Sequence, residues 1–396
     1  MRCVIITDAY PPATTSAAVQ VRDLAVEFAR QGHYISVLTP DPDIPSHLHI
    51  EQIDGVRVCR VRTQRIKNIG HLRRAWGEVL MPFTMFFKLT LSDQPQWHFD
   101  FIAWYSPSIF HGVLARLLCG SQKCKRYLIL RDIFPEWAAD VGLLSRGLPY
   151  QFFKTVALYQ YSIADVIGVQ AAGNLGYFEN WAQRSGRRLE VLKNWLDQAN
   201  HLRCRIRLDQ SLLAGRKVFV HAGNVGIAQG VLSIINAAYL LQERMDIGFL
   251  FVGRGSEFEN VKSYAESLNL SNILFFGEVP SDEISDLYSQ CYAGIVSLDL
   301  RHKTHNIPGK FVSYLRSGLP VLANVNIGNE LCELIDCERI GRAVSVDNPI
   351  QIADALVALV SDVDNDVEIR IRCANVFQRD FSVERAVKQI VDAVRI

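Results

Sequence analysis

The chain has 396 residues, 49% of them hydrophobic and 21% charged, which excludes a disordered or fibrous protein and suits two α/β domains. With 42 basic and 41 acidic residues the net charge is +1, so bulk charge gives no reason to expect nucleic acid as a partner. Nine scattered cysteines without a C-x-x-C motif favour buried, reduced thiols over a zinc site or a disulfide framework.

Short apolar segments alternate with helical patterns from the first residues onward. Residues 3–7 form a continuous apolar run typical of a buried parallel strand, and Val21, Leu24 and Phe28 fall on one face of a helix that Gly32 ends. Further strands are expected at residues 35–39, 101–104, 127–130, 166–169 and 189–192. This alternation predicts a doubly wound parallel sheet.

The same rhythm begins again after the polar segment 194–210. Strands are expected at residues 217–221, 249–252, 273–276, 295–298 and 321–323, with a helix at about 281–290 that has Ser281 as its N-cap. We therefore predict one domain at 1–198, a second at 199–375, and a C-terminal helix at 376–396 that crosses back to the first domain. Ligands of such sheets bind beyond the carboxyl ends of the strands.

A small, polar loop follows the first strand. It runs from Tyr10 to Ala18, and Ser16 and Ala17 could let the phosphates of a ligand approach the backbone at the next helix N-terminus. An ordinary β–α connection explains the same residues. The loop lacks G-x-G-x-x-G, which argues against a dinucleotide cofactor.

Two glycine-rich loops follow strands of the second series. AGNVGIAQG at 222–230 places three glycines between a strand and a helix, where backbone N–H groups and the helix dipole can bind a pyrophosphate. Its candidate donor-binding residues are Gly223, Asn224, Val225, Gly226 and Gln229. In the next loop, Gly253 flanks Arg254, whose planar fork suits a phosphate. The alternative explanations are that the glycines only form turns and that Arg254 is a solvated surface residue.

The segment 301–311, RHKTHNIPGKF, is basic and polar and leads into a helix. Lys310 opens that helix, where its ammonium can neutralise a leaving diphosphate, because charge develops there during glycosyl transfer. The alternative is that this segment is only a solvated, charged surface. The presence of Pro308 and Gly309 directly before an apolar helix argues against that alternative.

In the first series, RDIFPEW at 131–137 begins at a strand end. Asp132 and Glu136 could bind sugar hydroxyls or take the proton of an acceptor, and together with Arg131 they are candidate catalytic residues. A helix start explains the motif equally well, because Pro135 and Glu136 suit a first turn.

Residues 57–74 contain seven basic residues and no acid, and aromatic and apolar residues follow at once. This composition suits an anionic membrane surface, and a strand followed by a core helix is the alternative. No signal peptide or spanning stretch is apparent. The candidate membrane or acceptor residues are Arg65, Lys67, Arg73, Arg74, Trp76 and Phe83.

At these residues the chain resembles family 4 glycosyltransferases of the GT-B fold, in which two Rossmann-like domains with doubly wound parallel sheets face a central cleft. The likeness runs nearly end to end. It includes the YPP loop, RDIFPE, KNWLD at 193–197, GNVGIAQG, VGRGSE, FFGEVP at 275–280 and IPGKFVSYLRSGLPVLA at 307–323. Within the family it is similar to bacterial O-antigen and capsule enzymes of the L-fucosamine (FucNAc) transferase type.

The resemblance implies retaining transfer of a sugar such as L-FucNAc from a UDP-sugar to a polyprenyl-diphosphate-linked saccharide, without cofactor or metal. The first domain would bind the acceptor and the second the nucleotide sugar. The enzyme would be cytoplasmic and peripheral on the inner face of the cytoplasmic membrane.

By position, the GNVG loop would hold the diphosphate together with Arg254 and Lys310, and Glu278 and Val279 would lie near the base. Arg131 stands where many relatives carry a histidine near the reacting sugar. The donor sugar would be lined by His305, Asn306, Ile307, Pro308 and Gly309.

The chain departs from the family pattern at three places. Asn224 and Gln229 replace an arginine and a lysine, and the usual pair of glutamates falls at His305 and Ser313. Ser16-Ala17-Ala18 replaces the glycine pair of the first loop. Two other functions therefore stay open. One is a UDP-sugar 2-epimerase, which analysis of the products formed without an acceptor would reveal. The other is a non-catalytic partner subunit, which undetectable nucleotide binding would favour.

Overall fold

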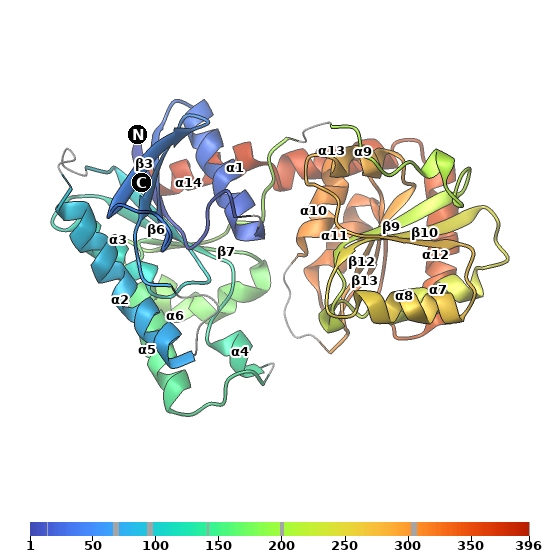
Figure 1. Ribbon diagram of the computed structural model, residues 1–396, viewed down its shortest axis with the longest axis horizontal. Helices are drawn as coiled ribbons and strands as arrows, with labels where there is room; N and C mark the ends of the chain where they lie inside the picture. Colours follow the sequence, from blue (N-terminus) through green and yellow to red (C-terminus); the bar gives the residue numbers. More distant parts are fainter. Residues whose placement is uncertain are drawn as a thin grey trace. The chain divides into compact units, whose positions relative to one another are not determined.

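The computed structural model describes residues 1–13, 15–65, 71–92, 98–140, 142–198, 202–301 and 307–395, with only the backbone of residues 71–75. The chain forms two compact units (Figure 1). The first contains residues 1–197 and 383–396, and the second contains residues 198–382.

The sheet of the first unit has the strand order β3-β4-β2-β1-β5-β6-β7-β8. Its pairs are parallel except β3 with β4, which is antiparallel. The strands are β1 (Arg2–Ile6), β2 (Tyr34–Pro40), β3 (Leu48–Ile53), β4 (Val56–Val61), β5 (Phe101–Tyr105), β6 (Lys125–Leu130), β7 (Val166–Val169) and β8 (Arg188–Val191).

Helices cover both faces of this sheet, which buries its apolar strands on two sides. One core joins α1 to α14 through residues such as Phe28 and Val387, and the other contains Met85 of α2, Leu114 of α3 and Ala157 of α5. The helices are α1 (Ser16–Arg30), α2 (His71–Thr90), α3 (His111–Cys119), α4 (Glu136–Asp140), α5 (Leu148–Ile163), α6 (Glu179–Ala182) and α14 (Val383–Arg395), with a 3-10 segment η1 (Ala172–Phe178).

The sheet of the second unit has the order β11-β10-β9-β12-β13-β14, and its pairs are parallel. The strands are β9 (Lys217–Asn224), β10 (Ile247–Arg254), β11 (Ile273–Phe276), β12 (Ala293–Ser297), β13 (Val321–Asn324) and β14 (Gly341–Val344). The helices are α7 (Leu232–Leu240), α8 (Phe258–Ser267), α9 (Ile284–Ser289), α10 (Gly309–Arg316), α11 (Glu330–Glu338), α12 (Pro349–Asn365) and α13 (Ile369–Asp380), with 3-10 segments η2 (Leu208–Gln210) and η3 (Ile227–Gln229).

The predicted strands are confirmed in type and order, and their ends differ by up to three residues. Three strands were absent from the expected set. The edge strands β3 and β14 were missed because each is short and only partly buried, and β4 was expected only as the alternative to a membrane segment. The predicted N-cap at Ser281 is wrong. Helix α9 begins at Ile284, and Glu283 precedes it without a side-chain cap.

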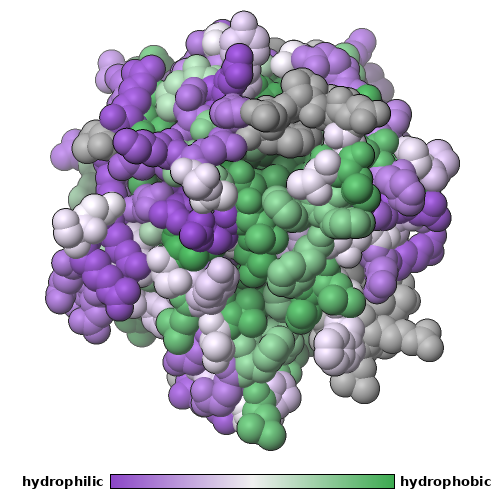
Figure 2. All heavy atoms as spheres, turned by 90° about the vertical axis from the view of Figure 1, so that its left-hand side faces the viewer, coloured by the Kyte–Doolittle hydropathy of each residue, from purple (hydrophilic) through white to green (hydrophobic). Residues whose placement is uncertain are grey.

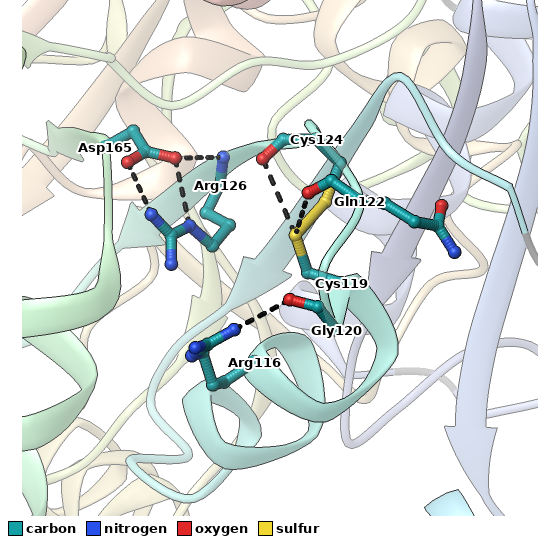
Figure 3. The surroundings of a disulfide bond; sticks show 7 residues. All are labelled: Arg116, Cys119, Gly120, Gln122, Cys124, Arg126 and Asp165. Atoms are coloured by element: carbon teal, nitrogen blue, oxygen red, sulfur yellow. Dashed lines mark hydrogen bonds and ion pairs between the residues drawn. A yellow bond between two sulfur atoms is a disulfide. The ribbon is translucent and has the colours of Figure 1, made fainter.

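The expectation that every cysteine is reduced is wrong for one pair. The structure joins Cys119, the last residue of α3, to Cys124, just before β6, as a disulfide (Figure 3). Beside it, Nε and Nη2 of Arg126 donate hydrogen bonds to the carboxylate oxygens of Asp165 at 3.0 Å and 2.7 Å (Figure 3). These bonds link the start of β6 to the start of β7. The seven other cysteines are free, and Cys337 is exposed.

Candidate functional site

The strand order of the second unit reverses between β9 and β12. From β9 the chain winds outward through β10 to β11, and it then returns to place β12 on the other side of β9. In open α/β sheets the crevice at such a switch point, beyond the carboxyl ends of the strands, is the place where ligands bind. The glycine-rich loop at 222–230 and the segment leading to Lys310 both begin at these strand ends.

The glycines of this edge have different roles. Gly253 and Gly255 have positive φ, and a Cβ there would lie 2.0 Å from the carbonyl oxygen of Gly223 and 2.1 Å from that of Val225. Glycine is therefore required at these two positions by the close approach of the ends of β9 and β10. Gly223, with φ of 118°, instead lies beside the Lys310 side chain, whose Cε would be 3.9 Å from an added Cβ.

The polar residues that replace the family's basic pair bond to one another. Oε1 of Gln229 accepts hydrogen bonds from Nδ2 of Asn224 at 3.0 Å and from the backbone N–H of Gly226 at 2.9 Å. The N–H of Gly226, which the sequence assigned to a diphosphate, is engaged within its own loop in this structure. A phosphate there would have to displace the Gln229 side chain.

Lys310 lies in the first turn of α10, and its Nζ is 2.8 Å from Nε2 of His221 on β9. The imidazole is completely buried, and burial followed by the charge of Lys310 holds the pKa of His221 well below its usual range. His221 is therefore neutral and accepts a hydrogen bond from the ammonium. Burial also lowers the pKa of Lys310 to about 7. Sequence reasoning missed His221, whose only signal was a basic residue inside an apolar strand.

The Tyr314 side chain of α10 fixes this helix against the sheet. Its hydroxyl donates to the carbonyl of Val220 at 3.0 Å and accepts from the N–H of Ala222 at 3.0 Å. Gly294 permits this contact, because a Cβ there would lie 2.4 Å from the tyrosine ring. These contacts place Lys310 beside the carboxyl end of β9.

Other predicted donor-binding residues lie at the same edge or close to it in the chain. Arg254 and Glu278 are exposed and pair with each other, Nε to Oε1, at 2.9 Å, a contact that contributes little to stability. Ile307 is buried, Pro308 occupies the N-cap of α10, and Gly309 begins it. Val279 and Ser313 are partly buried, and His305 and Asn306 lie outside the described residues.

A cavity of about 480 Å³ opens beside the glycine-rich loop, and Lys310 is not among its lining residues. Gly226, Gly230, Asp299, Arg301 and Asp347 are among its lining residues. Arg301 pairs with Asp299 at its rim. Among the described residues that were predicted to bind the donor, only Gly226 lines this cavity. The cavity therefore does not coincide with the Lys310 site.

In the first unit, Arg131 is 5% exposed at the end of β6. Its Nη1 donates to the carbonyl of Leu192 at 2.8 Å, and its guanidinium lies 4.5 Å from the ring of Trp195. Burial lowers the pKa of Arg131. The side chain thus fastens residues 192–195 to the sheet, and its contact with a reacting sugar stays a prediction.

The two acids of the RDIFPEW motif differ in their surroundings. Desolvation raises the pKa of Asp132, which is only partly exposed. Glu136 begins α4, accepts a hydrogen bond from the Tyr177 hydroxyl at 2.5 Å, and lies 3.5 Å from Nζ of Lys154. These partners give Glu136 a structural role, because they link α4 to α5 and η1.

The remaining predicted residues of this unit lie at the start of α1 and on α2. Thr15 caps α1 by accepting from the N–H of Ala18 at 3.3 Å, and Ser16 and Ala17 form its first turn. Trp76 and Phe83 are exposed on α2. Arg65 pairs with Asp43 at 2.5 Å. Lys67 lies outside the described residues, as do the side chains of Arg73 and Arg74.

Two Rossmann-like units with doubly wound sheets confirm the predicted GT-B fold, and solved structures share it. Sucrose-phosphate synthase from Thermosynechococcus elongatus matches with a TM-score of 0.71 and 15% identity over 100% of this chain and 98% of that one. Anabaena HepE, solved in complex with UDP and glucose, matches with a TM-score of 0.67 and 14% identity over 99% of both chains.

Residues 216–362 of the second unit match the model of the family described as glycosyl transferases group 1. WbjE of Pseudomonas aeruginosa, assigned as a glycosyltransferase, is 26% identical over 58% of this chain and 58% of its own length. WcaI of Escherichia coli K12, assigned as a glycosyl transferase of colanic acid biosynthesis, is 22% identical over 90% of this chain and 91% of its own length. These matches support a glycosyltransferase of the type that the sequence motifs indicated.

Proposed function

We propose that the chain is a retaining, metal-independent glycosyltransferase that moves a sugar from a UDP-sugar to a polyprenyl-diphosphate-linked saccharide in O-antigen or capsule biosynthesis. The proposed sugar is an N-acetylated deoxyhexosamine such as L-FucNAc. The assignment of WcaI to colanic acid biosynthesis supports a polysaccharide pathway, and the HepE complex with UDP and glucose supports a nucleotide-sugar donor.

The observation that carries the proposal is the Lys310 amine at the switch point of the second sheet. Its described partner is a neutral histidine, and among the residues that the structure describes it pairs with no carboxylate. A partly buried cation beside a glycine loop is an incomplete arrangement that an anion completes. The leaving diphosphate of a UDP-sugar is such an anion, and an ammonium beside it stabilises the developing charge.

Calorimetry with UDP tests this site directly, with GDP and NAD as controls. We expect UDP to bind and the double variant Arg254→Ala, Lys310→Ala to lose that binding. Binding of GDP in place of UDP would change the donor class. Absence of binding to all three would favour a non-catalytic subunit. Unchanged affinity in the presence of EDTA is expected for metal-independent donor binding.

The affinity for UDP should fall as the pH rises above 7. Because burial lowers the pKa of Lys310 to about 7, the amine of the free site loses its proton above that pH, and the anion must then bind together with a proton. The dissociation constant should rise by up to about tenfold between pH 7.5 and 8.5. Lys310→Arg is the matched control, since its guanidinium stays charged and should remove most of this dependence.

We also propose that the first unit rests on an anionic membrane through α2 and α5. On α2 one apolar face enters the core through Met81, Met85 and Leu89. A second row is exposed at the helical spacing of three or four residues and consists of Trp76, Leu80, Phe83 and Phe87. A helix that is apolar on both faces has a second apolar partner.

Helix α5 adds exposed Leu148 and Phe152 to this surface. Both α2 and α5 start near the carboxyl edge of the sheet, and Figure 2 shows hydrophobic side chains gathered in a continuous band on this side of the molecule. The two helices contain four basic residues and one acid, Glu78, a balance that suits anionic lipid. No helix of the described segments is long and apolar enough to cross a bilayer.

A further inference from the structure

The sheet of the first unit also has a switch point, between β1 and β5. From β1 the chain winds outward through β2 to β4 and β3, and it returns to place β5 on the other side of β1. Asp8 lies two residues beyond the end of β1. His111 begins α3, which follows β5. The two side chains therefore meet in the crevice where a ligand of this sheet would bind.

The contact between them is short and mostly buried. Nε2 of His111 lies 2.7 Å from Oδ1 of Asp8. The histidine side chain is completely buried, whereas 29% of the aspartate side chain is exposed. Because Oδ1 is itself buried, the exposure of Asp8 falls on its other side-chain atoms. The buried imidazole thus lies against the inner side of the carboxylate and leaves its outer side open.

Burying the His111 ring beside Asp8 destabilises the fold, so the arrangement indicates a function for the Asp8 carboxylate. Both ring nitrogens of His111, and Oδ1 of Asp8, have no hydrogen-bond partner of good geometry among the residues that the structure describes, although burying unpaired polar atoms destabilises a fold. An apolar residue at position 111 would avoid this cost. A fixed, partly open carboxylate at a ligand crevice is suited to accept hydrogen bonds from sugar hydroxyls.

We propose that Asp8 binds a hydroxyl of the acceptor saccharide next to the reacting hydroxyl and that His111 is the positioning residue that holds the Asp8 carboxylate. The inference rests on the proposed function and adds the contact that orients the acceptor. The bound hydroxyl donates to the Asp8 carboxylate, which orients the neighbouring reacting hydroxyl, and the oxygen of that reacting hydroxyl forms the new bond to the anomeric carbon. The bond from that carbon to the diphosphate breaks, UDP leaves with the electron pair, and the proton of the reacting hydroxyl passes to the leaving diphosphate.

Asp8→Asn tests this role, because it keeps the shape and removes the charge. The assay uses UDP-L-FucNAc as donor and farnesyl-diphosphate-linked N-acetylglucosamine as the acceptor probe. We expect kcat/KM for the acceptor to fall about 10- to 100-fold, as befits a lost hydrogen bond to a charged group. The calorimetric Kd for UDP should stay within about twofold of that of the unmodified chain.

Two variants of His111 separate positioning from folding. His111→Gln keeps an N–H donor and should retain more acceptor kcat/KM than His111→Leu, which should match Asp8→Asn. Should the leucine variant fail to fold, Asp8→Asn and His111→Gln decide alone. Asp100→Asn is the matched control, since Asp100 is an exposed aspartate at the opposite edge of the sheet, before β5.

The outcomes distinguish the two proposals. Unchanged acceptor kcat/KM in Asp8→Asn would overturn the acceptor role while leaving the transferase in place. An equal loss of UDP affinity would also overturn it, because Asp8 would then act on the donor or on the whole fold. An unmodified chain that neither binds UDP nor transfers sugar would overturn the proposed function and the acceptor role with it.

Discussion

Replacing Lys310 with alanine is expected to lower turnover by about 10²- to 10³-fold. The ammonium is placed by α10 beside the carboxyl end of β9, where the strand order reverses, and its described partner is the neutral imidazole of His221. Negative charge grows on the leaving diphosphate in the transition state, so loss of this cation costs most in the chemical step. Steady-state kcat and KM for the donor, measured together, separate this effect from weaker binding.

A matched lysine on the same strand provides the control. Lys217 begins β9 at the opposite edge of the sheet and pairs with Asp364. Lys217→Ala should keep its turnover within about twofold, because surface ion pairs contribute little. Wild-type turnover in Lys310→Ala would remove the main support for the nucleotide-sugar site and would require the donor diphosphate to bind elsewhere.

The sequence alone could predict most strands because buried parallel strands are short, continuous apolar runs between turn residues. It could not predict β3, since LHIEQI has polar residues at half of its positions and lies at a sheet edge. Lys310 was predictable from its motif at a helix start. His221 was not, because inside an apolar strand a single histidine shows no partner until the fold brings α10 beside it.

The Asp8–His111 contact joins residues more than 100 positions apart, and only the sheet order brings them together. The Cys119–Cys124 pair was missed for a different reason, because a spacing of five positions belongs to no recognised cysteine motif. Arg131 shows how burial can be hidden in a sequence. A strand-end position suggested an open side chain, whereas Trp195 and the carbonyl of Leu192 enclose it.

Helix α2 shows why the proposed membrane surface could be suspected from the sequence although its residues could not be assigned. Its apolar residues are too numerous for one face, and a pattern cannot say which of two apolar faces enters the core. The structure assigns Met81, Met85 and Leu89 to the core and leaves Phe83 and Phe87 exposed. The proposed surface also includes α5, which the sequence did not indicate because its exposed residues lie beside no cluster of basic residues.

The double variant Phe83→Glu, Phe87→Glu is therefore expected to lose binding to anionic vesicles, by about 100-fold or more. Each aromatic side chain moved from water into the interfacial region contributes about 1.5–3 kcal/mol, and two added acids repel the anionic surface. Co-sedimentation with phosphatidylglycerol-containing vesicles measures the partition coefficient, and the residual binding should weaken further as salt is added.

Ile371→Glu is the matched control for this variant, because Ile371 is 60% exposed on α13 of the second unit and Phe87 is 62% exposed on α2. The control should bind vesicles like the unmodified chain, and both proteins should keep their UDP affinity. A double variant with unchanged vesicle binding would show that the exposed row of α2 serves another apolar partner. If it instead loses vesicle binding together with transfer to a lipid-linked acceptor, while keeping UDP binding, then α2 is what brings the first unit to its substrate.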